Sequence, residues 1–157
     1  MVCLDNLYLS PLAAGLLNFA AETKGFAEHM EIDSAGTKVQ KPGVTPAPKI
    51  LTTAENHGFS LTHEAREIDS EDLDYFDEIL VMNEMLLEEV LSFAKTPVQK
   101  AKVRLLTEYD PRKDCASDIA NPWCDAANAS LASDAEIFEE AYEQLWYSCM
   151  GFLKRAA

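Results

Sequence analysis

The chain has 157 residues, of which 48% are hydrophobic, and its formal net charge is −14. This length predicts one domain, residues 1–157, with a core of its own. The acidic charge excludes a protein that binds the backbone of nucleic acids, which needs a basic face, and no segment has the apolar length of a membrane-spanning helix.

The cysteines are few and far apart in the sequence: Cys3, Cys115, Cys124 and Cys149. Their spacing fits neither a metal site nor a disulfide framework, so we expect reduced thiols and no metal or cofactor. The first residues also lack the cationic start and long apolar stretch of a secretory signal. Together these features predict a cytoplasmic protein.

Hydrophobic spacing predicts strands that alternate with helices. The first helix is expected from Ser10 to about Lys24, with Ser10 as its N-cap and Pro11 in its first turn. A short strand should follow within residues 30–37. Further on we expect helices over 48–57, 84–94 and 134–155, a short acidic helix or turn over 69–76, strands over 78–82 and 102–106, and a loop over 110–133.

This alternation predicts βαβ units and a parallel sheet. Such sheets bind ligands at the carboxyl ends of their strands, and Cys3 stands where a first strand would end. The opening MVCLDNLYLSP therefore places a cysteine in a short loop before a helix. The amides and dipole at a helix start favour an anion, and the same field lowers the pKa of a thiol.

These segments, in this order, resemble the low-molecular-weight protein-tyrosine-phosphatase family over essentially the whole chain. The first residues resemble the family's phosphate loop, through Val2-Cys3-Leu4, Asn6 and Ser10-Pro11. Further segments of the chain match the family in register. They are residues 32–37, His63 with Ala65 and Arg66, Phe76-Asp77 with 79–82, 102–106 with Tyr109-Asp110-Pro111, and Phe138-Glu139 with Ser148-Cys149. Low-molecular-weight arsenate reductases share the fold, but Cys115 and Cys124 do not match their cysteine pattern.

The resemblance implies an α/β fold, a three-layer αβα sandwich around a four-stranded parallel sheet. The first strand looks truncated, because only Met1-Val2 precede Cys3. A missing central strand would leave its two neighbours with unpaired backbone groups. Either the natural start lies upstream or the chain fills this gap in another way.

The family's activity implies that Cys3 attacks the phosphorus of a phosphotyrosine, or another phosphomonoester, as a thiolate. An arginine of the loop and an aspartic acid placed before Pro122 assist, and water then releases phosphate. Trp123 would form the wall against the phenol ring. The phosphate loop itself maps onto Leu4, Asp5, Asn6, Leu7, Tyr8 and Ser10, with Asn6 in a left-handed conformation and the Ser10 hydroxyl supporting the thiolate.

Three substitutions remove parts of this chemistry. Leu9 stands at the arginine position, and loss of a bidentate guanidinium costs roughly 10³–10⁵ in rate by analogy with arginine fingers. Asn121 stands at the general-acid position, where the loss is typically about 10²–10⁴. Asp5 replaces a glycine, so its carboxylate would repel a dianion or fill the amide nest itself. Asp118 and Asp125 do not have the offset of the general acid.

Other residues of the motifs have structural interpretations. Tyr8 stands where many members have a second loop cysteine, so the protective disulfide of those members is lost. We expect His63 and Arg66 to form a structural hydrogen-bond network rather than to act in catalysis. For Cys3 itself two interpretations stay open. It is either a retained nucleophile or a small buried residue left over from an active ancestor.

The sequence thus predicts a family member that acts on phosphotyrosine if it acts at all, with very low or no turnover. The alternative is a non-catalytic pseudophosphatase that keeps the scaffold and engages a protein partner as a binding or regulatory module. A truncated or decaying gene product is a third interpretation, supported by the short first strand.

Overall fold

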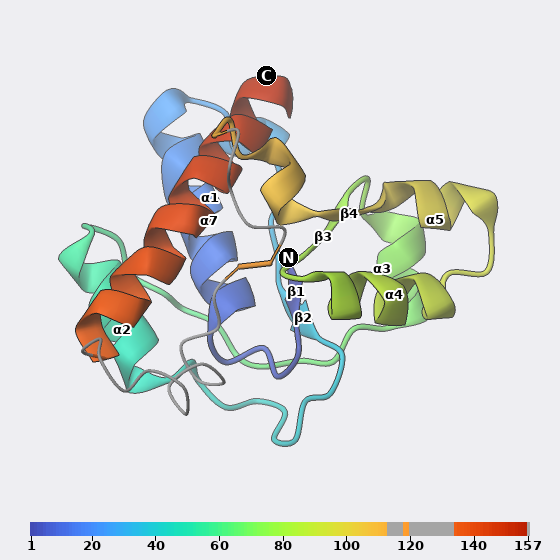
Figure 1. The fold of residues 1–157 in the computed structure, drawn as a ribbon, viewed down its shortest axis with the longest axis horizontal. Helices are drawn as coiled ribbons and strands as arrows, with labels where there is room; N and C mark the ends of the chain where they lie inside the picture. The colour runs from blue at the N-terminus through green and yellow to red at the C-terminus, as the bar shows by residue number, and fades with distance from the viewer. Residues whose placement is uncertain (113–117, 120–133, 157) are drawn as a thin grey trace.

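The computed structural model describes residues 1–112, 118–119 and 134–156. Strands and helices alternate along the first two thirds of the chain, and one long helix closes it (Figure 1). The elements are β1 (Val2–Cys3), α1 (Leu9–Lys24), η1 (Ala27–His29), β2 (Ala35–Gly36), α2 (Pro48–Asn56), α3 (Ser70–Tyr75), β3 (Ile79–Val81), α4 (Glu84–Phe93), α5 (Pro97–Lys102), β4 (Val103–Leu105), η2 (Leu106–Tyr109) and α7 (Asp134–Ala156).

The four strands form one parallel sheet in the order β2-β1-β3-β4. Helices α1, α2 and α7 pack together on one face of the sheet, and α3, α4 and α5 lie on the other (Figure 1). The predicted three-layer αβα sandwich with a four-stranded parallel sheet is therefore confirmed. Its core contains the whole of β3 and the inner faces of α1 and α7.

The central strand β1 has only two residues but pairs with both neighbours. Val2 lies opposite Ala35 of β2 on one side and Val81 of β3 on the other. The strand expected within residues 30–37 is correspondingly reduced to Ala35–Gly36. Met1 extends the pairing with β2 by one bond, since its carbonyl accepts from Ala35 N at 3.0 Å.

Two features of the helices differ from the sequence prediction. Helix α1 begins at Leu9, after Tyr8 as N-cap and without a side-chain cap, so the prediction of Ser10 as N-cap is wrong. The hydroxyl of Ser10 is fully buried and faces the strands instead. Helix α5 was not predicted, although Thr96 and Gln99 form a capping box around Pro97.

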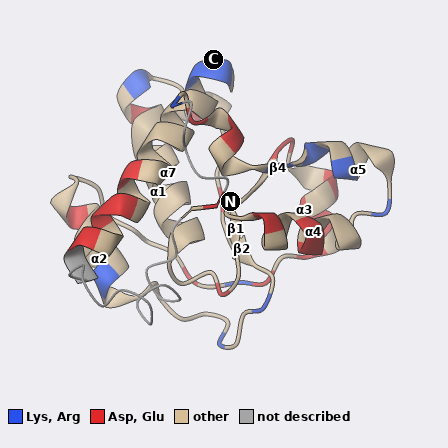
Figure 2. Cartoon of the chain, in the orientation of Figure 1, with Lys and Arg blue, Asp and Glu red and all other residues tan. Residues whose placement is uncertain are grey.

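Acidic side chains are spread over α7, α2 and α4, and the basic residues form no continuous face in this view (Figure 2). This distribution agrees with the exclusion of nucleic-acid binding. Among the described residues, no helix combines the length and the apolarity needed to cross a bilayer.

Helix α7 lies unusually close to η2. A Cβ built on Gly151 would stand 1.7 Å from the carbonyl oxygen of Tyr109. The obstacle is backbone, so α7 and η2 would have to separate to admit any side chain. Gly151 therefore sets the distance between the closing helix and the end of the sheet.

We expect Gly151→Ala to lower the free energy of unfolding by about 2–3 kcal/mol, because overpacking outweighs the better helix propensity of alanine. Urea denaturation measures this loss. Gly15→Ala is the matched control in α1, since the nearest atoms to its Cβ belong to side chains and not to backbone: Leu61 Cδ2 at 2.0 Å, the end of a flexible side chain, and Phe59 Cε2 at 3.3 Å. That change should stay within about 1 kcal/mol of the parent, and equal losses in both variants would contradict the close-approach argument.

Candidate active site

The loop between β1 and α1 turns on Asn6. This is the one described non-glycine residue with positive φ, at 58°, and it is completely buried. Its amide nitrogen Nδ2 donates to Ser10 Oγ at 3.0 Å and to Ser34 Oγ at 2.9 Å. Asparagine tolerates left-handed backbone better than most residues, and these bonds fix its side chain under the loop.

On its other side, Asn6 joins the loop to residues 63–66. Its oxygen Oδ1 accepts from Arg66 N at 2.9 Å and lies 2.8 Å from His63 Nε2. Because Oδ1 can only accept a hydrogen bond, the facing ring nitrogen Nε2 of His63 carries a proton. The other ring nitrogen, Nδ1, does not need to carry one. Burial lowers the pKa of His63, so the neutral ring is favoured.

Arg66 extends this network away from the cysteine. Its guanidinium forms a bidentate pair with Asp72 at 2.9 Å and contacts Asp33 at 2.8 Å. The hydrogen bonds with Asp72 raise the pKa of Arg66 further above its ordinary range. The carboxylates of Asp33 and Asp72 thus both pair with the guanidinium of Arg66, the one cation of this network. These ion pairs hold α3 and the segment before β2 against the loop.

The sulfur of Cys3 is buried beneath the loop. It accepts from Ser10 Oγ at 2.9 Å and from Asn6 N at 3.3 Å, and it lies 3.7 Å from Asp5 Oδ1. Burial raises the pKa of the Cys3 thiol, and the bonds from Ser10 and Asn6 only partly oppose this effect. The thiol is therefore held in its protonated form near neutral pH.

The carboxylate of Asp5 is turned into the loop. Its Oδ1 accepts from Leu7 N at 3.1 Å and from the Cys3 thiol. A loop amide that could have bound an external anion is thus already satisfied by the protein's own anion. The same carboxylate stabilises the thiol rather than the thiolate, because a thiol donates its proton to it and a thiolate cannot.

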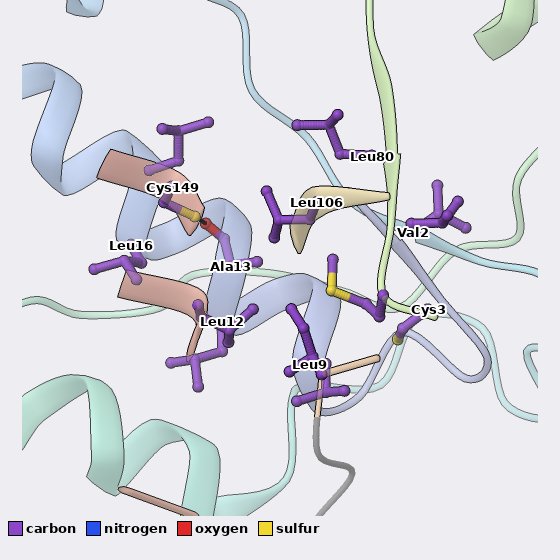
Figure 3. Packing of buried hydrophobic residues seen from close by; sticks show 14 of the residues in the cluster. Val2, Cys3, Leu9, Leu12, Ala13, Leu16, Leu80, Leu106 and Cys149 are labelled. Atoms are coloured by element: carbon purple, nitrogen blue, oxygen red, sulfur yellow. Dashed lines mark hydrogen bonds between the residues drawn. The ribbon is translucent and has the colours of Figure 1, made fainter. Parts of the chain in front are cut away.

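Leu9 is the first residue of α1, and 4% of its surface is exposed. Its side chain belongs to the central hydrophobic cluster, which also contains Leu12 and Cys3 (Figure 3). Ser10, the next residue, reaches back to Cys3 and also bonds the Ala35 carbonyl at 3.2 Å. The position predicted for a phosphate-binding cation is thus part of the core.

Gly36, at the end of β2, was not singled out as a site residue. A Cβ there would lie 2.8 Å from Leu4 O and 2.9 Å from Asn6 N. The absence of a side chain lets β2 approach the loop backbone, where Thr37 N bonds Cys3 O at 3.0 Å. The Ala-Gly-Thr turn at the strand's end was the available signal.

The predicted general-acid position Asn121, the predicted wall Trp123 and the alternative acid Asp125 lie outside the described residues. Asp118 is described, and its Oδ1 accepts from Glu84 N at 3.0 Å at the start of α4. This contact gives Asp118 a structural role at the start of α4. The described residues bring together no group of three His, Cys, Asp or Glu side chains that could hold a metal ion.

A buried cysteine at the carboxyl end of a central parallel strand, followed by an amide-lined loop and a helix, defines a cysteine-phosphatase-like α/β protein. The family described as low molecular weight phosphotyrosine protein phosphatase matches residues 1–157. The chain therefore belongs to this family.

Individual relatives agree with this assignment. The low molecular weight phosphotyrosine protein phosphatase of Homo sapiens is 32% identical over 157 residues, 99% of this chain and 92% of the relative. A protein tyrosine phosphatase from Entamoeba histolytica superimposes with a TM-score of 0.87 at 19% identity, over 99% of this chain and 93% of that one. A Drosophila arginine phosphatase gives a TM-score of 0.85 at 27% identity, over 99% and 94%.

We predict that alkylation of Cys3 by iodoacetamide is slow at pH 7 and has a pH midpoint above the ordinary thiol value. The sign follows from burial, which disfavours the thiolate, so the rate rises only as pH passes the raised pKa. Mass spectrometry of the tryptic peptide measures it. In Asp5→Asn the midpoint should fall, because the repulsive carboxylate is gone; a wild-type midpoint below the ordinary value would contradict the geometry.

We also predict that Asn6→Ala lowers the free energy of unfolding by about 3 kcal/mol, since it leaves buried partners unsatisfied and strains a left-handed position. Asn6→Gly is the matched control, because glycine keeps the backbone conformation and loses only the side-chain bonds. It should cost about 1 kcal/mol less than alanine. Denaturant unfolding tests both, and a neutral Asn6→Ala would show that the network does not hold the loop.

Proposed function

We propose that residues 1–157 act as one domain whose cysteine-based hydrolysis of phosphotyrosine is strongly impaired. The observation that carries this proposal is the electrostatic character of the loop. A carboxylate, Asp5, lies 3.7 Å from the nucleophile position, while the arginine position holds the buried Leu9. A phosphate dianion would meet an anion at Asp5 and no cation at Leu9, where the family's chemistry needs one.

The expected sizes of the rate losses support a strongly impaired phosphatase rather than one whose activity is modestly altered. Loss of a bidentate guanidinium costs roughly 10³–10⁵, and an amide at position 121 forfeits general acid catalysis worth about 10²–10⁴. These losses do not simply add, because the groups cooperate. The larger of them alone would leave turnover near the limit of a sensitive assay.

A second candidate is a non-catalytic module that binds a protein partner. It is favoured by the hydrogen bond from Leu7 N to Asp5, because this bond gives a loop amide a partner within the protein. The Asn6 network supports the scaffold in either case. Under this candidate the loop is a structural element, and the partner would recognise the protein surface rather than deliver a phosphate.

The experiment is hydrolysis of p-nitrophenyl phosphate, a phosphotyrosine peptide and a phosphoarginine peptide by the purified chain. We expect wild-type kcat/KM at least about 10³-fold below that of the triple variant Asp5→Gly/Leu9→Arg/Asn121→Asp, which restores all three groups. Adding Cys3→Ser to the triple variant should abolish the recovered activity. Far-UV circular dichroism checks that each variant is folded, because Leu9 is a core residue.

Leu9→Lys in place of Leu9→Arg is the matched control, since it supplies a charge without the planar fork and should recover less activity. Wild-type activity that disappears with Cys3→Ser would overturn the proposed impairment. A folded triple variant without activity would show that these substitutions do not explain it. Orthovanadate that binds the wild-type loop would count against the non-catalytic candidate, because that loop should not hold an anion.

A further inference from the structure

A cavity of about 600 Å³ runs along helix α1, between this helix and residues 58–63. One wall consists of α1 residues at helical spacing, which are Pro11, Ala14, Gly15, Asn18, Phe19 and Glu22. Residues 58–63 form the other wall, and residues 32–34 complete the lining. We call this cavity the α1 trough. Its volume is within the range of pockets that bind small molecules.

One end of the trough lies at the Cys3 loop and the other lies about three turns further along α1. His63 marks the first end, because its Nε2 lies 2.8 Å from Oδ1 of Asn6 in the loop. Glu22 marks the second end, in the last turn of α1. From Pro11, beside the loop, to Glu22 the helix rises about 16 Å. A ligand that contacts both ends must therefore be elongated.

The loop end of the trough offers hydrogen-bond acceptors and an excess of negative charge. Burial lowers the pKa of His63, so the ring is neutral, and Nδ1 is an acceptor to which the described residues supply no donor. Asp33, also in the lining, pairs with Arg66 at 2.8 Å. Because Arg66 pairs with Asp72 as well, two carboxylates share one guanidinium at this end.

The far end of the trough is also anionic. The carboxylate of Glu22 is exposed and forms no ion pair with any residue that the structure describes. Among the described residues that line the trough, the charged side chains are Glu22 and Asp33, and none is a lysine or an arginine. An anionic ligand would be repelled at both ends, whereas a cation would be attracted to each of them.

Between these ends the walls of the trough are apolar. The half-buried ring of Phe19 stacks on Phe59, with the ring centroids 5.5 Å apart, so its position is fixed. The side chain of Leu61 packs onto Gly15 from the opposite wall. A methylene chain that lies between the two walls would remove part of the Phe19 and Leu61 surface from water.

We propose that the α1 trough binds a linear aliphatic diamine, with one ammonium at Glu22, the other at His63 Nδ1 and Asp33, and the methylene chain against Phe19 and Leu61. An ammonium only donates hydrogen bonds, so it matches ends that offer only acceptors. The order cation, apolar chain, cation in the ligand repeats the order of the groups along the trough. This binding is independent of the chemistry at Cys3.

The test is isothermal titration calorimetry of the full-length chain with diaminooctane, which has an ammonium at each end of an eight-carbon chain. We expect saturable binding to a single site. Octylamine, with one ammonium, should bind at least about tenfold more weakly, because a charge-assisted hydrogen bond at one end is lost. Diaminobutane, too short to reach both ends, should bind no better than octylamine, and octanediol should not bind. These comparisons use the unaltered protein, so folding does not enter.

NMR of the chain labelled with nitrogen-15 in its histidines tests the contact at the loop end directly. Diaminooctane should shift the Nδ1 signal of His63, because this nitrogen then accepts a hydrogen bond. The signals of His29 and His57 should stay in place, since neither residue lines the trough. An unmoved His63 signal at saturating diamine would overturn the proposed position of the ligand.

Two pairs of variants locate the diamine in the trough. Asn18→Trp, which fills the trough from an exposed position of α1, should abolish the binding, whereas Thr23→Trp, exposed on the same helix outside the lining, should bind like the wild type. Glu22→Gln should weaken binding about two- to fivefold, as expected for an exposed ion pair. Glu28→Gln is its matched control, an exposed acid that does not line the trough. Circular dichroism establishes that each variant is folded.

Equal affinity for diaminooctane and octylamine would overturn the proposal, because the second cation would then have no part in recognition. Equal losses in Glu22→Gln and Glu28→Gln would overturn it as well, by showing that the amine responds only to the overall acidic charge. Binding of N-acetyl-lysine amide as tight as that of the diamine, and abolished by Asn18→Trp, would overturn the assignment to a diamine and identify a lysine side chain of a protein as the source of the cation.

Discussion

The left-handed turn at Asn6 is the constraint on which the site depends. Its buried side chain bonds Ser10 in α1, Ser34 before β2 and Arg66 in the following segment. One residue thus joins three parts of the chain that are far apart in sequence. The bonds to Ser10 and Ser34 are buried and the bond from Arg66 N is partly buried. Loss of the Asn6 side chain would leave buried groups unsatisfied, so this network stabilises the shape of the loop.

This division explains how the fold of the family is kept in a loop that carries a carboxylate at Asp5 and a buried apolar side chain at Leu9. The residues that shape the loop, Asn6, Ser10 and Gly36, make the contacts described above. The residues that would handle charge differ, with Asp5 bonded to Leu7 N and Leu9 packed in the core. Shape and charge are separable here because Asn6, which bonds Ser10, Ser34 and Arg66, is a different residue from those that set the charge of the loop.

The two edges of the sheet differ in what lies between β2 and β3. At the carboxyl edge, the two residues of β1 place Cys3 between these strands. At the amino edge, a cavity of about 500 Å³ lies between residues 30–35 and residues 76–80. The contacts that shape the Cys3 loop therefore belong to the carboxyl edge, away from this cavity.

The sequence by itself determined the order of the strands and of the main helices, the parallel sheet and the family, because these follow from hydrophobic periodicity and from motifs in register. It did not predict the short helix α5. It also located the substitutions at Asp5 and Leu9. The tertiary structure decided the rest. Residues 30–34 pair with no strand although their pattern predicts one, because β-structure needs a partner that the local sequence does not contain. Ser10 bonds Cys3 instead of capping α1, because a buried hydroxyl bonds the acceptors that packing brings to it.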